Sequence, residues 1–182
     1  MMSNTPFKLS GHYGTVSEKN GIHTIWFERM IDHPIEKVWE AITVPEKIAQ
    51  WLSSNIEKPG TLINLQLGRR IRLQYMMALP EGVITGLTNG QLLEITWSPH
   101  HITKWELFKE GRKKCRIVFT ESLNEPLAMH GIVGYHAYLD LLTYVLDGGT
   151  VPAGFLNDYA DLSKDIYTAY SELLTGNPTY TQ

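Results

Sequence analysis

The hydrophobic period of the chain changes near residue 124, and this change constrains the fold more than any other feature of the sequence. Between residues 63 and 122, short β-prone runs alternate apolar and polar side chains and are broken by turn residues such as Asn89-Gly90, as in an antiparallel meander. The predicted strands are 63–67, 70–78, 83–88, 91–98, 102–108 and 115–122. After residue 126 the apolar residues recur at helical spacing, which predicts one long helix over 129–147.

The residues before the meander predict a hairpin and two short helices. Asn20-Gly21 is a strong signal for a tight hairpin turn, so residues 12–17 are expected to pair with a strand over 22–31. Pro34 suits the start of a helix over 34–42, because its missing N–H needs no partner there. Residues 43–46 have the Thr-x-x-Glu pattern of a capping box, which predicts a second helix over 46–52.

This order of elements predicts an α+β fold of the helix-grip type. A curved antiparallel sheet wraps around a long C-terminal helix, two short helices follow the first strand, and sheet and helix diverge at one end to enclose a cavity. We expect a flexible N-terminus over 1–10, a helix-grip domain over 11–147 and an additional amphipathic helix within 148–182. This last helix is predicted to pack on the same domain, with docking against a partner as the alternative.

Composition excludes several classes of protein. The chain has 182 residues, a formal net charge of −3 and one cysteine, Cys115, so an internal disulfide is excluded and nucleic-acid binding is not expected. The histidines lack the spacing of a metal pair, and we predict no metal and no cofactor. No apolar run approaches the ~20 residues that a membrane span requires, and the polar start has no signal-peptide core. These features predict a cytoplasmic protein.

Several motifs together resemble the START-like, or SRPBCC, superfamily. The segment Arg29–Leu52 (RMIDHPIEKVWEAITVPEKIAQWL) is similar to the opening of that superfamily. More narrowly, it resembles the bacterial type of the family named for the activator of heat-shock-protein-90 ATPase. Gly68-Arg69-Arg70, Leu93–Trp97 and Gly134–Asp140 match later motifs of that family in the same order. The resemblance covers roughly residues 11–147.

The resemblance implies a helix-grip domain of a kind that mostly binds small hydrophobic or amphipathic molecules, with a minority of cyclases and hydrolases. Two positions depart from the family pattern: Tyr135 replaces the usual Trp, and Arg69 replaces the second Gly of a Gly-Gly pair. The N-terminal domain that does most of the stimulation in the eukaryotic activator has no counterpart here. The family name therefore gives little support to a chaperone role, and fold alone does not settle function.

Aromatic side chains predicted to converge between sheet and long helix are the main candidates for a ligand site. Tyr and Trp suit a pocket because they combine apolar area with a polar group, although the same residues also fill ordinary cores. A cavity of ~300 Å³ or more would favour binding, and a packed interior would not. The predicted ligand-binding residues are Trp51, Tyr75, Met77, Trp97, Trp105, Tyr135, Tyr138 and Leu142.

Three polar residues are further cavity candidates. Strand parity turns Arg29 and Glu121 inward, and we expect these two charges to face one another or share a polar network, since a buried charge needs a partner. A fixed pair that stabilises strand register is one interpretation, and ligand contact is the other. His136 with Glu121 or Tyr135 is a possible acid/base set.

The sequence as a whole predicts a protein that binds a small apolar or amphipathic ligand, with a stress-related role as one hypothesis, without metal, cofactor or catalysis. Two alternatives stay open. One is a cyclase or hydrolase that uses the same cavity, and the other is a co-chaperone-like module that binds a protein partner.

Overall fold

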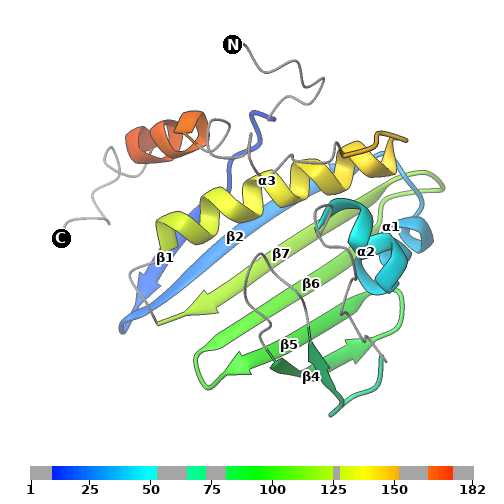
Figure 1. Ribbon diagram of the computed structural model, residues 1–182, viewed down its shortest axis with the longest axis horizontal. Helices are drawn as coiled ribbons and strands as arrows, with labels where there is room; N and C mark the ends of the chain where they lie inside the picture. The colour runs from blue at the N-terminus through cyan, green and yellow to red at the C-terminus, as the bar shows by residue number, and fades with distance from the viewer. Residues whose placement is uncertain (1–9, 53–64, 73–80, 125–127, 152–163, 174–182) are drawn as a thin grey trace.

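An antiparallel sheet and the helices on one of its faces form the molecule (Figure 1). The computed structural model describes residues 10–52, 65–72, 81–124, 128–151 and 164–173. Within these residues the sheet has seven strands in the order β1-β2-β7-β6-β5-β4-β3. The strands are β1 (Thr15–Lys19), β2 (Ile22–Ile31), β3 (Arg70–Arg72), β4 (Glu81–Thr88), β5 (Leu92–Ser98), β6 (His101–Lys109) and β7 (Cys115–Leu123).

Two short helices and one long helix pack on the sheet. They are α1 (Ile35–Thr43), α2 (Pro45–Trp51) and α3 (Ala128–Leu146). The helix α3 extends along β2 and crosses the face of the sheet, while α1 and α2 cover the end of that face beside the last turns of α3 (Figure 1). This arrangement confirms the predicted α+β helix-grip fold. Among the residues described, no helix combines the length and apolar character needed to cross a bilayer.

The strands alternate as the sequence predicts. In β2, Ile25, Phe27, Arg29 and Ile31 point inward and are buried, whereas Met30 is 53% exposed. The hairpin between β1 and β2 turns at Asn20 and Gly21, whose positive φ angles of 56° and 78° match a tight two-residue turn. The buried residues form two clusters, one beneath α1 and α2 and one between β2, β7 and α3.

Two local predictions are wrong. The helix α2 begins at Pro45 after Val44 without a side-chain cap, because the Thr43 hydroxyl donates instead to the Trp39 carbonyl at 2.6 Å. Thr43 still belongs to the last turn of α1, where that carbonyl lies within reach of its hydroxyl. The predicted strand 63–67 is not formed at 65–67, which lead into a turn at Gly68; residues 63 and 64 lie outside the described residues.

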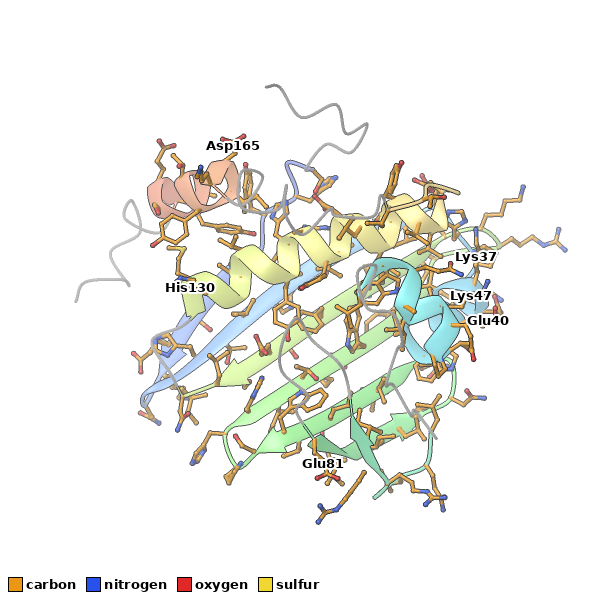
Figure 2. The ribbon with its side chains drawn as sticks, in the orientation of Figure 1. Lys37, Glu40, Lys47, Glu81, His130 and Asp165 are labelled. Atoms are coloured by element: carbon orange, nitrogen blue, oxygen red, sulfur yellow. The ribbon has the colours of Figure 1, made fainter. Side chains whose placement is uncertain are left out.

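A further helix over 164–173 lies beside the first turns of α3. Figure 2 labels Asp165 on this helix and His130 at the start of α3, and the rings of His130 and Tyr167 are 6.2 Å apart. Ile166 and Tyr170 are buried in the cluster that includes Phe27. The described part of the terminal region therefore covers Ile166 and Tyr170 against this same chain, whereas Tyr167 and Leu173 stay exposed. Residues 1–9, 152–163 and 174–182 lie outside the described residues.

Candidate functional site

An apolar cavity lies between the sheet, α2 and α3, where sheet and helix diverge. Its volume is about 60 Å³, several times the ~10–15 Å³ that one water molecule requires and well below the ~300 Å³ of a drug-sized pocket. The cavity is therefore smaller than predicted. Its described lining residues are Ile42, Ile48, Trp51, Leu52, Leu93, Ile95, Trp97, Thr103, Trp105, Phe119, Tyr135 and Tyr138.

A continuous row of aromatic rings forms one wall of the cavity. The ring centroids of Trp51 and Trp105 are 6.3 Å apart, those of Trp105 and Phe119 4.6 Å, and those of Phe119 and Tyr135 4.4 Å. Trp51 is fixed at its end of the row by a hydrogen bond from Nε1–H to the Ala41 carbonyl at 2.9 Å. Contacts of this kind hold rings in tilted and edge-on arrangements, so the wall is pre-formed by the fold.

Several polar side chains lie next to the Tyr135 end of this row. Glu121 Oε1 accepts hydrogen bonds from the Tyr135 hydroxyl at 2.8 Å and from His101 Nε2 at 2.7 Å. The ionised carboxylate only accepts, so His101 carries its proton on Nε2. Trp97 Nε1–H donates to Thr103 Oγ1 at 3.0 Å. The Glu121 side chain is 7% exposed, whereas that of His101 is 41% exposed, so this cluster connects the cavity wall with solvent.

The structure does not bring Arg29 and Glu121 together. Both are buried, but Arg29 Nη2 lies 3.9 Å from Asp140 Oδ1 on α3, and Arg29 Nη1–H donates to the Glu28 carbonyl at 3.2 Å. Burial lowers the pKa of Arg29, and the charge of Asp140 offsets part of this effect. The predicted pair is wrong because Arg29 lies opposite Ile117 in the sheet and Glu121 lies opposite Ile25.

His136 belongs to a second polar network, away from the cavity. Its Nε2–H donates to the Ser10 carbonyl at 3.0 Å and lies 3.3 Å from Asp140 Oδ2. The Tyr170 hydroxyl donates to His136 Nδ1 at 2.9 Å and accepts the Gly14 N–H at 2.8 Å. Burial raises the pKa of this hydroxyl. The predicted acid/base set of His136 with Glu121 or Tyr135 is not formed among the described contacts.

Some of the predicted ligand-binding residues line the cavity and others do not. Trp51, Trp97, Trp105, Tyr135 and Tyr138 line the cavity. Leu142 is buried in the core cluster beneath α1 and α2 and is not among the described lining residues. Tyr75 and Met77 lie outside the described residues.

His101 and Thr103 were not among the predicted site residues. The predicted strand 102–108 leaves His101 out, but His101 begins β6 and has the same parity as Thr103 and Trp105. Extending that alternation by one residue toward the N-terminus would have turned His101 inward. The sequence holds no comparable signal for Phe119 as a cavity residue, because its parity predicts burial without saying against what.

A curved antiparallel sheet that grips one long helix, with an apolar cavity between them, defines a helix-grip domain of the START-like, or SRPBCC, class. The family model described as "Activator of Hsp90 ATPase homolog 1-like protein" matches residues 32–146. The chain belongs to this family, which confirms the resemblance seen in the sequence. No curated protein matched in the comparison.

Solved structures share the fold at low identity. A conserved protein of unknown function from Enterococcus faecalis is 20% identical, with a TM-score of 0.69 over 88% of this chain and 91% of that one. CalU16 from Micromonospora echinospora is 16% identical, with a TM-score of 0.67 over 94% and 100%. The Aha1 dimer from Colwellia psychrerythraea is 15% identical, with a TM-score of 0.56 over 68% and 95%. At these identities the likeness shows the fold alone.

Proposed function

We propose that this chain binds a small apolar or amphipathic molecule in the cavity between β5–β7, α2 and α3. The observation that carries the proposal is the row of four packed rings beside a space that the described side chains leave empty. Protein interiors are otherwise close-packed, with few voids larger than a water molecule. Membership of the SRPBCC class, known for hydrophobic-ligand cavities, supports the same function.

The size and chemistry of the cavity define the ligand. A volume of about 60 Å³ accepts a compact group and not a long chain. Most of the described lining is apolar, and Thr103, Trp97 and Tyr135 add hydrogen-bonding atoms at one end of the cavity. An amphipathic ligand would therefore place its polar atom at this end and its apolar part against Leu93 and Ile95.

Toluene and indole are suitable probes, because both are compact and aromatic. Titration is followed by ¹H–¹⁵N NMR of the tryptophan indole groups, since Trp51, Trp97 and Trp105 line the cavity. We expect their Nε1–H signals to shift with saturation. Saturable binding without any shift at these three indoles, or no binding of either probe, would contradict the proposed site.

A filling variant and its matched control test the location. Leu93→Phe adds bulk on the cavity side of β5, and Leu92→Phe makes the same change one residue away on the outer face. We expect Leu93→Phe to weaken toluene binding by at least about tenfold, which corresponds to about 1.4 kcal/mol, and Leu92→Phe to leave it within about twofold. Thermal melting verifies that both variants fold, and Ile48→Phe on α2 provides a second filling variant.

A further inference from the structure

The described residues place a negative charge, and no lysine or arginine, beside the cavity. None of its described lining residues is a lysine or arginine. The carboxylate of Glu121 accepts a hydrogen bond from Tyr135, which lines the cavity. Two cation–π contacts occur among the described residues, Arg29 on Phe27 at 5.2 Å and Arg116 on Phe108 at 4.2 Å. Neither ring lines the cavity, so among the described residues no arginine or lysine lies over a ring of the cavity wall.

We infer that the ligand presents a positively charged group, a substituted ammonium, to the aromatic row and to Glu121. The inference rests on the proposed function, because it names the chemical class of the molecule that the same cavity takes. Three observations carry it: the aromatic faces, the buried carboxylate and the small volume.

The aromatic faces are the first observation. The face of an aromatic ring carries a partial negative charge, and Trp is the strongest of the natural rings in attracting a cation. Trp51, Trp105 and Phe119 lie in one row, and Trp97 faces the same cavity from β5. A cation held among several such faces exchanges its hydration for ring contacts, as in the aromatic cages that bind quaternary ammonium groups.

The buried carboxylate is the second observation. Thr103, a lining residue, is the cross-strand neighbour of Glu121, so the carboxylate lies beside the cavity wall on the same inner face of the sheet. Oε1 accepts hydrogen bonds from the Tyr135 hydroxyl and from His101 Nε2–H, and a hydrogen bond donated to a carboxylate does not remove its charge. A negative charge in a poorly hydrated site attracts a cation and repels an anion more strongly than in water, which excludes carboxylic acids as favoured ligands.

Gly131 on α3 leaves room for the Glu121 carboxylate between the helix and the sheet. A Cβ atom at residue 131 would lie 3.4 Å from Glu121 Oε2 and 2.7 Å from Ile25 Cδ1. The absent side chain lets α3 approach β2 and β7 closely, with Tyr135 one turn further along the helix to donate to the same carboxyl group. The position of the negative charge is thus built into the contact between helix and sheet.

The volume is the third observation. About 60 Å³ fits a compact head group and excludes a long acyl chain from the interior. A trimethylammonium group is compact, nearly spherical and covered with carbon, so it suits an apolar cage better than a strongly hydrated primary ammonium does.

An isosteric series separates charge from shape. Choline and 3,3-dimethylbutan-1-ol have nearly the same shape but differ in charge, and 3,3-dimethylbutanoate adds the anion. Each is titrated into the full chain and followed by the tryptophan indole signals, alongside toluene. We expect choline to bind at least about tenfold more tightly than the alcohol, as cation–π attraction and one buried carboxylate together predict, and the anion to bind most weakly.

The variant Glu121→Gln removes the charge and keeps the hydrogen-bonding shape. We expect it to reduce the preference for choline over the alcohol to about twofold or less while the affinity for the alcohol stays within about twofold. Glu106→Gln is the matched control, because it removes a carboxylate from the outer face of β6. If Glu121→Gln does not fold, Trp105→Leu replaces it and must weaken choline more than the alcohol.

The outcomes distinguish this inference from the proposed function. Equal binding of choline and the alcohol, or a preference that survives Glu121→Gln, overturns the cationic ligand and leaves the apolar cavity site standing. Equal loss of both probes in Trp105→Leu has the same meaning. Failure of every probe to bind, toluene included, overturns both.

Discussion

Removing one hydroxyl group should loosen the attachment of the terminal helix. In Tyr170→Phe the ring stays and only the hydroxyl is lost. That hydroxyl accepts the Gly14 N–H at 2.8 Å and donates to His136 Nδ1 at 2.9 Å, and Tyr170 is 0% exposed. The edge-on contact of the ring with Tyr13, at 5.2 Å between centroids, involves no hydroxyl and is kept. The variant therefore isolates the polar contribution.

The magnitude follows from the two groups that lose their partner. Leaving a buried donor or acceptor unsatisfied costs about 1–3 kcal/mol, so the loss of both partners should lower the free energy of unfolding by about 2–6 kcal/mol. A chain of this length loses roughly 2–4 °C of melting temperature per kcal/mol. We expect the melting temperature of Tyr170→Phe to fall by roughly 4–24 °C.

Urea denaturation, followed by tryptophan fluorescence, measures this change. Tyr167→Phe is the matched control, because Tyr167 lies on the same helix, is 45% exposed and should change stability by less than about 0.5 kcal/mol. A loss of less than about 0.5 kcal/mol in Tyr170→Phe, or an equal loss in both variants, would contradict this prediction. Either result would mean that the network through His136 does not hold the helix in place.

Two further predictions concern titration. Burial by itself disfavours the ionised form of Asp140, but hydrogen bonds from His136 and Ser10 outweigh it and hold the pKa of the carboxyl below its ordinary value of 3.8; folding therefore favours the charged form. The free energy of unfolding should decline as pH falls below about 4, and less steeply in Asp140→Asn; equal slopes in urea titrations across that range would contradict this. Burial raises the pKa of the Cys115 thiol to about 11, so iodoacetamide at about pH 8 should label it only in unfolded protein. Rapid labelling of the native chain, followed by mass spectrometry, would show that the thiol is accessible.

The regular alternation of apolar and polar residues was sufficient to predict most of the fold. In β2 and β7 one face is buried, and a shift of one residue would expose every apolar side chain of the strand, so parity alone predicts which residues point inward. It placed Arg29 and Glu121 inside correctly. The period of 3.6 located α3 in the same way, because one face of the helix is covered by the sheet.

Local motifs failed where two hydrogen bonds compete for one group. Thr43 and Glu46 have the spacing of a capping box, yet the Thr43 hydroxyl bonds to the Trp39 carbonyl. Which bond forms depends on where α1 ends, and that point is set by the packing of Val38 and Trp39 against the core. The sequence motif contains no information about this packing.

Periodicity and the order of the motifs were enough to predict the family, the order of the elements and the residues that face the interior, because each depends on single elements or on motifs in a fixed order. Which interior residues meet depends instead on how the elements pack against one another. Arg29 pairs with Asp140, and Glu121 binds Tyr135 and His101, because the twist of the sheet and the crossing of α3 set these distances. The volume of the cavity also depends on this packing. It is the small difference between the space that the backbone encloses and the space that the side chains fill.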